Sequence, residues 1–214
     1  MPEYWNLGKS EHFCLTLSAG RSAEEIVEIY GADGRRAHWL SSDECFDSIE
    51  PTSTNTILRA GILGDWAFCI EFHNPIGFLN AVVRDLSTHT RTIVLSRTAK
   101  AFKEFDYVVN GQLVESFEPG DPSSTWGQSE HDFSRRVHER HPTPSQAITA
   151  CLDVIAEHIG NELTTEILRG PLLSAVVDAP DQAALARPDP RLQRTTPPGT
   201  PSTLGRRLRG PQGI

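Results

Sequence analysis

The stretch Gly64-Asp65-Trp66-Ala67-Phe68-Cys69-Ile70-Glu71-Phe72 contains the longest apolar run of the chain and predicts its central strand. Five apolar residues in a row, Trp66 to Ile70, leave no polar face for water, so a strand here must be covered on both sides. Gly64 and Asp65 favour a tight turn before the strand. Pro75 ends it, because proline has no N–H to donate to a ladder. The fold is therefore expected to be layered around a buried sheet.

Working outward, hydrophobic periodicity predicts six strands and six helices. The strands are expected near residues 13–17, 55–61, 66–73, 91–96, 103–109 and 112–118. The helices are expected near residues 22–30, 78–86, 130–141, 145–159, 163–168 and 171–177. The segment 32–51 has no clear period and is expected to be a loop or a short helix. The pattern predicts an α+β fold, with a mixed, largely antiparallel sheet covered by helices and a disordered C-terminal tail.

Local signals set several helix ends. Ser22 and Glu25 have the spacing of a capping box, in which each side chain accepts from the other residue's backbone N–H. Ser145 is expected to cap the long helix that Gly160 closes. Pro171 suits the first position of a last helix, because its missing N–H has no partner there in any case.

Asn110-Gly111 between two alternating runs is the strongest hairpin signal in the chain, because a type I′ turn needs positive φ at both positions. If the register is unbroken from Val109 opposite Gln112, one apolar face forms. On the other face Asp106 then lies opposite Glu115. Like charges directly opposite are unfavourable, so this pair needs exposure, a cation or a raised carboxyl pKa, and exposure is the favoured interpretation.

Charge and composition divide the chain into two parts. Its 214 residues suffice for one sizeable core, which is assigned to residues 1–180. Residues 187–214 hold six Arg, one Asp and six Pro, a net charge of +5 in a total of −8, so residues 1–186 carry −13. Residues 181–214 are therefore expected to form a Pro/Arg-rich disordered tail.

Several classes of protein are disfavoured. An acidic body repels phosphate, so no nucleic acid is expected to bind the folded domain, although Arg206, Arg207 and Arg209 leave weak binding through the tail open. No apolar run reaches the length of a membrane span, and the start of the chain does not resemble a secretory signal. Four widely spaced cysteines without a C-x-x-C pair favour a reduced, cytoplasmic protein.

The chain resembles a known family at four short motifs. They are Phe13-Cys14-Leu15-Thr16-Leu17, Gly64-Asp65-Trp66 leading to Glu71, Phe117-Glu118-Pro119, and Leu163-Thr164. Together they are similar to the DUF6461 family of uncharacterised actinobacterial proteins, over about residues 12–178. The resemblance implies a small intracellular α/β or α+β domain. It brings no catalytic residue set.

Candidate site residues are few. Glu71 is a carboxylate in an otherwise apolar strand, two residues before His73, at the strand end where open α/β sheets place ligand contacts. Asp65 or Glu118 are the carboxylates expected to join them if the protein is a small hydrolase-like enzyme. Trp66 and Trp126 are candidates for lining a pocket, against the commoner role of aromatic residues in a core.

Metal and cofactor motifs are absent from the sequence. His138 and His141 have a spacing that can bind metal on a helix, but a charged, water-facing helix is the simpler interpretation. No cofactor and no metal site are therefore expected. The leading hypothesis is a non-enzymatic protein-interaction or ligand-binding module with an acidic surface, whose partner is a protein. The hydrolase-like cleft is the alternative.

Overall fold

The structure is a computed structural model that describes residues 7, 12–50, 52, 54–72, 74–98, 102–128, 130–140 and 145–178. These residues belong to one compact unit, Met1–Pro180. His73, His141 and the predicted tail 181–214 lie outside the described residues. None of the described helices has the length and apolar character needed to cross a membrane.

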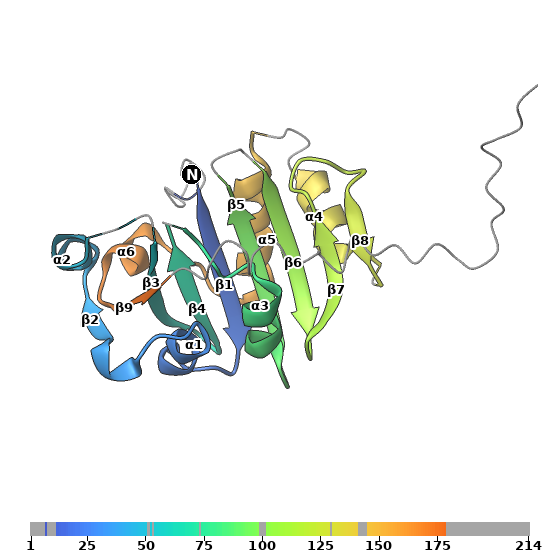
Figure 1. Ribbon diagram of the computed structural model, residues 1–214. Helices are drawn as coiled ribbons and strands as arrows, with labels where there is room; N and C mark the ends of the chain where they lie inside the picture. Colours follow the sequence, from blue (N-terminus) through green and yellow to red (C-terminus); the bar gives the residue numbers. More distant parts are fainter. Residues whose placement is uncertain are drawn as a thin grey trace, which may run out of the picture. The chain divides into compact units, whose positions relative to one another are not determined.

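Nine strands form one sheet in which every neighbouring pair is antiparallel (Figure 1). The strands are β1 Phe13–Ala19, β2 His38–Leu40, β3 Asn55–Leu63, β4 Trp66–Glu71, β5 Arg91–Arg97, β6 Lys103–Val109, β7 Gln112–Phe117, β8 Thr125–Gly127 and β9 Leu172–Asp178. Their order across the sheet is β2-β9-β3-β4-β1-β5-β6-β7-β8. The predicted α+β class is confirmed.

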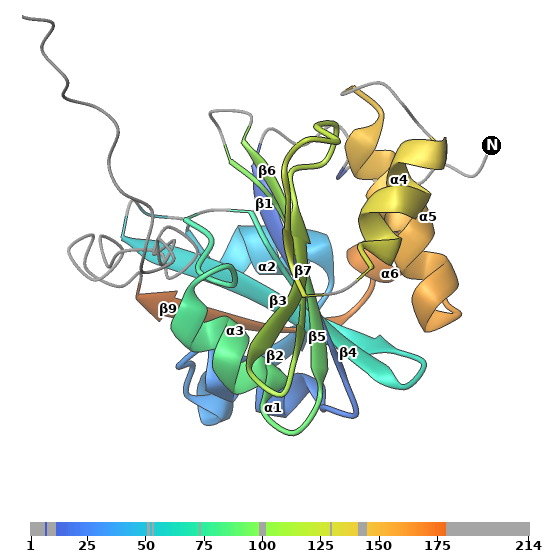
Figure 2. The ribbon, with the colours of Figure 1, turned by 90° about the vertical axis from the view of Figure 1, so that its right-hand side faces the viewer.

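Helices cover both faces of this sheet (Figure 2). They are α1 Ala23–Ile29, α2 Ser42–Ser48, α3 Asn80–Ser87, α4 Asp132–Arg140, α5 Ala147–Ile159 and α6 Thr165–Arg169, with a 3₁₀ turn, η2, at Gly34–Arg36. Helices α4, α5 and α6 pack on one face, and α1 and α3 pack on the other. The sheet is therefore a buried middle layer.

Strand β4 lies inside the sheet as predicted, between β3 and β1, and all six of its residues are buried. Because side chains alternate along a strand, its residues divide between two cores. Trp66, Phe68 and Ile70 belong to the α5 core, and Ala67 and Cys69 belong to the α1 core. An apolar run without a polar face was thus a correct sign of a strand covered on both sides.

Two of the four predicted helix-end signals, the Ser22–Glu25 box and Gly160, are confirmed, and the other two, at Ser145 and Pro171, are wrong. The Ser22–Glu25 capping box forms, with N···O distances of 2.8 and 3.1 Å. Gly160 ends α5 in the left-handed conformation, at φ 73°. The predicted Ser145 cap is wrong, because α5 begins after Gln146, which makes no side-chain capping hydrogen bond.

The predicted last helix is a strand. Residues Leu172–Asp178 form β9, which lies between β2 and β3 and pairs with both. A short apolar run has no period long enough to distinguish a strand from a buried helix, and the β-branched Val176 and Val177 suit the strand. The segment 32–51 also holds more structure than expected, namely η2, β2 and α2.

The predicted hairpin is correct at its turn and wrong beyond it. Asn110 and Gly111 both have positive φ, 51° and 75°, as a type I′ turn requires. Val108 and Val109 pair with Leu113 and Gln112 as expected, but the register then shifts by one residue. Tyr107 consequently lies opposite Glu115.

The shift overturns the predicted Asp106–Glu115 pair. Asp106 lies opposite Ser116, the residue after Glu115, and successive strand residues point to opposite faces. The two carboxylates therefore face different layers and are not neighbours. Both are buried, so the expectation of simple exposure is also wrong.

Candidate functional site

Glu71 is completely buried at the end of β4, where two backbone N–H groups, the Tyr30 hydroxyl and the Cys14 thiol reach its carboxylate. Ile76 donates its backbone N–H to Oε2 at 2.7 Å, and Gly77 donates to Oε1 at 3.0 Å. The Tyr30 hydroxyl donates to Oε1 at 3.2 Å, and its oxygen also lies 2.9 Å from the Thr16 hydroxyl. The carboxylate therefore ties the β4–α3 connection to α1 and β1.

This arrangement requires glycine at position 77. A Cβ there would lie 2.3 Å from the Tyr30 hydroxyl oxygen and 2.5 Å from Oε1 of Glu71, closer than real Cβ atoms approach. Burial raises the pKa of Glu71 to about 7, against the lowering effect of the Ile76 N–H and the Tyr30 hydroxyl. Both carboxylate oxygens of Glu71 thus accept hydrogen bonds, and the residue serves as an anchor for the connection.

Asp65 and Trp66 lie at the opposite end of β4 from Glu71. Asp65 is exposed in the β3–β4 turn. Trp66 is buried, with the Arg91 guanidinium 5.2 Å from its ring centroid and the His158 ring 6.0 Å away. At about 3.4 Å per residue, the strand separates Asp65 from Glu71 by roughly 20 Å.

Glu118 and Trp126 lie farther across the sheet. Glu118 follows β7, which is four places from β4 in the strand order, or about 19 Å at the usual strand spacing. Trp126 is on the edge strand β8 and is 44% exposed. Asp65, Glu71 and Glu118 therefore do not meet in one cleft, and His73 lies outside the described residues.

Two buried charged residues have structural roles that the sequence did not reveal. Glu115 accepts from the backbone N–H groups of Phe133 and Ser134, at 3.2 and 2.7 Å, and so caps α4. Arg59 donates to the carbonyl oxygens of Leu40 and Gly170, each at 3.0 Å, and joins β2 to the end of α6. Burial lowers the pKa of Arg59. The roles of Glu115 and Arg59 both depend on partners that are remote in the sequence.

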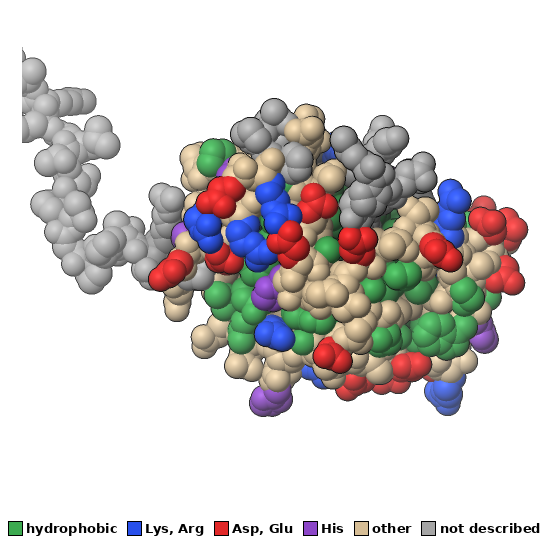
Figure 3. All heavy atoms as spheres, turned by 180° about the vertical axis from the view of Figure 1, so that it is seen from behind, with side chains coloured by type: hydrophobic (Ala, Val, Ile, Leu, Met, Phe, Trp, Pro, Cys, Tyr) green, Lys and Arg blue, Asp and Glu red, His purple; other side chains and the backbone are tan. Residues whose placement is uncertain are grey.

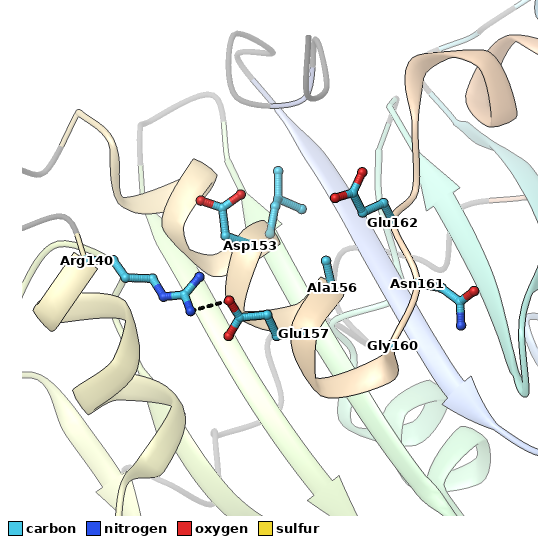
Figure 4. Close-up of a pocket in the computed structure, with 8 residues that line it drawn as sticks. Arg140, Asp153, Ala156, Glu157, Gly160, Asn161 and Glu162 are labelled. Carbon is cyan, nitrogen blue, oxygen red and sulfur yellow. Dashed lines mark hydrogen bonds and ion pairs between the residues drawn. The ribbon is translucent and has the colours of Figure 1, made fainter. Parts of the chain in front are cut away.

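A pocket of about 440 Å³ opens on the outer side of the α4–α5 layer (Figure 4). Its lining comes from the end of α4, one face of α5 and the segment that follows α5. The lining residues are Arg140, Leu152, Asp153, Ala156, Glu157, Gly160, Asn161 and Glu162. Leu152, Ala156 and Gly160 are spaced four residues apart, so they follow one side of α5 beneath the charged residues.

The charged lining consists of three carboxylates and one guanidinium. Arg140 and Arg136 both form ion pairs with Glu157, and the distance from Nη2 of Arg136 to Oε2 of Glu157 is 2.8 Å. The hydrogen bond from Arg140 lowers the pKa of Glu157, and the same bond raises the pKa of Arg140. Figure 4 shows Asp153 and Glu162 on the same opening as the Arg140–Glu157 pair. The lining side chains therefore bring three acidic groups and one basic group to the pocket.

The surface around the pocket combines both signs of charge (Figure 3). Arg135 and Arg136 on α4 form ion pairs with Asp132 on the same helix, and Arg135 also pairs with Glu139. Over the described residues, no group of three or more His, Cys, Asp or Glu side chains is arranged to hold a metal ion. The sequence did not predict the pocket, because the positions of Asp153 and Glu157 indicate only the water-facing side of an amphipathic helix.

Comparison with known proteins identifies a family. Residues 3–139 match a family model described as a family of unknown function, DUF6461. The chain belongs to the DUF6461 family. No curated protein and no solved structure matches it. The DUF6461 match includes Glu71 and Glu115 and ends before Arg140, so every residue that lines the pocket lies beyond it.

Proposed function

We propose that the protein is a protein-interaction module whose α4–α5 pocket takes an arginine side chain of a basic partner. The observation that carries this proposal is the pocket itself, which carboxylates from α5 and from the following segment line. Its volume of about 440 Å³ falls within the range of about 300–1,000 Å³ that is usual for ligand pockets.

The chemistry of the lining favours arginine. A guanidinium offers five N–H donors in a plane, so it can contact carboxylates on more than one side, here those of Asp153 and Glu162. Its alkyl stem is apolar and can lie on the partly exposed Ala156 while the charged end stays at the opening.

The charge of the folded part supports a basic partner. Residues 1–186 carry a net charge of −13, which attracts cationic segments over the whole surface and accelerates their association. The same charge repels nucleic acid, so we propose that the folded domain does not bind it. Binding to a basic partner should weaken as salt is raised.

The test compares an arginine peptide with its citrulline counterpart, a neutral side chain of almost the same shape. Titration of the full chain should show that the arginine peptide binds and that the citrulline peptide does not. The double variant Asp153→Asn/Glu162→Gln should weaken that binding about tenfold, equivalent to 1.4 kcal/mol. Glu157 is left intact because it holds Arg136 and Arg140 in place.

The matched control is Asp43→Asn/Asp47→Asn on α2, which removes the same charge from exposed positions outside the pocket. This variant should keep the affinity of the original chain. Equal loss in the two variants would show that only the overall charge attracts the peptide. Equal binding of the citrulline peptide, or no binding of either, would also reject the pocket.

We also propose a cytoplasmic location. Cys14, Cys45, Cys69 and Cys151 are all buried free thiols, which is compatible with a reducing compartment. Cell fractionation with an antibody against the chain tests this directly. Recovery in a secreted or periplasmic fraction would contradict it.

A further inference from the structure

The chain contains an arginine-rich segment of its own, residues 187–214. This segment has six arginines, no lysine and a net charge of +5, whereas residues 1–186 carry −13. Opposite charges of this size attract each other. Three of the six arginines are gathered in Arg206-Arg207-Leu208-Arg209. One sequence therefore holds both a pocket lined by carboxylates and a cluster of guanidinium groups.

We propose that the arginine-rich segment is itself a ligand of the α4–α5 pocket and competes there with basic partners. The inference rests on the proposed function, because it needs a pocket that accepts a guanidinium. One arginine of the Arg206–Arg209 cluster takes the place beside Asp153 and Glu162. A partner must then bind the pocket more tightly than the chain's own arginines do, so the segment regulates access to the pocket.

The pocket already holds one guanidinium on one of its acids. Arg140, at the end of α4, forms an ion pair with Glu157 on α5, and Arg136 pairs with the same carboxylate. Arginine is thus compatible with this surface. Because Glu157 is engaged from α4, an incoming guanidinium is directed to Asp153 and Glu162, which lie on the same opening (Figure 4).

The pocket lies at the far end of β3 from the last described residue, Asp178. Asp178 pairs with Asn55, the first residue of β3. Gly64 follows the other end of that strand, nine residues later, or roughly 30 Å at the usual rise. Gly64 lies against Asn161 in the pocket lining, since a Cβ at position 64 would be 2.4 Å from the Asn161 amide nitrogen. The segment therefore has to span roughly 30 Å.

The position of the cluster in the sequence suits this span. Arg206 comes 28 residues after Asp178, and the composition of the intervening segment predicts disorder. A disordered chain of that length has a root-mean-square end-to-end distance of roughly 30 Å. The effective concentration of a tethered group is greatest when these two lengths match. Arg187 is nine residues from Asp178, and full extension to about 30 Å only just covers the distance.

The first test uses the full chain and the arginine peptide of the proposed function. The cluster variant, Arg206→Gln/Arg207→Gln/Arg209→Gln, removes the competing guanidinium groups. Isothermal titration should show that this variant binds the arginine peptide about tenfold more tightly than the original chain. The factor corresponds to an internal ligand with a Kd of about 0.1 mM at an effective concentration of about 1 mM.

The matched control is Arg35→Gln/Arg36→Gln/Arg84→Gln, which removes the same positive charge from exposed positions on η2 and α3. Both variants make the chain equally more acidic, but the control keeps the arginine-rich segment intact. The cluster variant should therefore gain clearly more affinity than the control. Equal gains would mean that only the net charge matters, and the inference would be wrong.

A synthetic peptide of residues 201–214 tests the same contact without the tether. It should bind the cluster variant of the full chain, and the peptide with citrulline at positions 206, 207 and 209 should not. Adding Asp153→Asn/Glu162→Gln to the cluster variant should weaken the binding about tenfold. Undiminished binding would place the peptide elsewhere on the acidic surface and would contradict the inference.

The outcomes separate this inference from the proposed function. If neither the original chain nor the cluster variant binds the arginine peptide, the pocket is not an arginine site and both proposals fail. If the two chains bind the arginine peptide equally well, the proposed function stands and the arginine-rich segment is not a ligand of the pocket.

Discussion

Glu71 is a buried carboxylate whose hydrogen-bond donors are all neutral. Tyr30, Ile76, Gly77 and the Cys14 thiol supply donors, and none of them brings a positive charge. The cost of burying the ionised form therefore dominates, which is why the pKa rises to about 7. The sequence singled out Glu71 because an acid in an apolar strand is unusual, but it could not identify donors that tertiary packing brings together.

The raised pKa predicts a definite sign for the pH dependence of stability. The folded state holds the Glu71 proton more tightly than the unfolded state, whose carboxyl titrates near 4.5. Stability contributed by this group is thus greatest below pH 4.5, falls as pH rises, and levels off above pH 7. The fall is about 3 kcal/mol for a shift of this size. Urea unfolding at a series of pH values measures it.

Glu71→Gln should remove this part of the slope, because an amide does not titrate. The substitution should also lower the free energy of unfolding at pH 5 by about 1–3 kcal/mol. The reason is that the NH₂ group of the glutamine side chain meets the backbone N–H of Ile76 or Gly77. Asp65→Asn, at an exposed carboxylate on the same hairpin, should keep the slope. If Glu71→Gln shows the original pH dependence, Glu71 does not titrate as described.

At the scale of elements, α4 is held by an acid from the neighbouring strand β7. The carboxylate of Glu115 accepts from two first-turn N–H groups, those of Phe133 and Ser134. It reaches them only because the register shift turns Glu115 toward the helical layer. Gly127 is required beside this segment of β7, since a Cβ at position 127 would lie 2.2 Å from the carbonyl oxygen of Val114.

Glu115→Ala should therefore destabilise the protein by about 1–3 kcal/mol, because it leaves two buried N–H groups without their acceptor. Equilibrium unfolding in urea measures the change in free energy. Glu139→Ala, which removes an exposed acid from α4 itself, is the matched control and should have a much smaller effect. Equal effects of the two substitutions would show that Glu115 does not act as the cap.

An element could be predicted when the residues that determine it are close together in the sequence. The Ser22 cap, the Asn110-Gly111 turn and the run through Trp66 each depend on neighbours in sequence, and each was predicted correctly. The strand state of β9 depends on β2 and β3, far earlier in the chain, and it was not. The pocket needs α4 and α5 side by side, so it could not be foreseen either.

At the scale of the whole molecule, the family match and the fold have different boundaries. The match ends at residue 139, yet β9 lies between β2 and β3, and α5 covers the face of the sheet that holds Trp66 and Phe68. Residues 145–178 are therefore part of the fold, and the antiparallel order of the sheet is completed only by β9, the last described strand.

A fragment of residues 1–140 should consequently fail to fold cooperatively. It loses β9 and the α5 core side chains Ile148, Cys151, Leu152, Val154 and Ile155. Each large apolar side chain contributes about 1.5–3 kcal/mol on burial, so their loss approaches or exceeds the total stability of about 5–15 kcal/mol that is usual for a domain. Circular dichroism on heating should show a broad, low-amplitude change, whereas a chain of residues 1–178 should unfold in one sharp transition. If the shorter fragment unfolds as sharply as the longer one, β9 and α5 are additions to a complete fold, and the sheet does not need β9 to hold β2 in place.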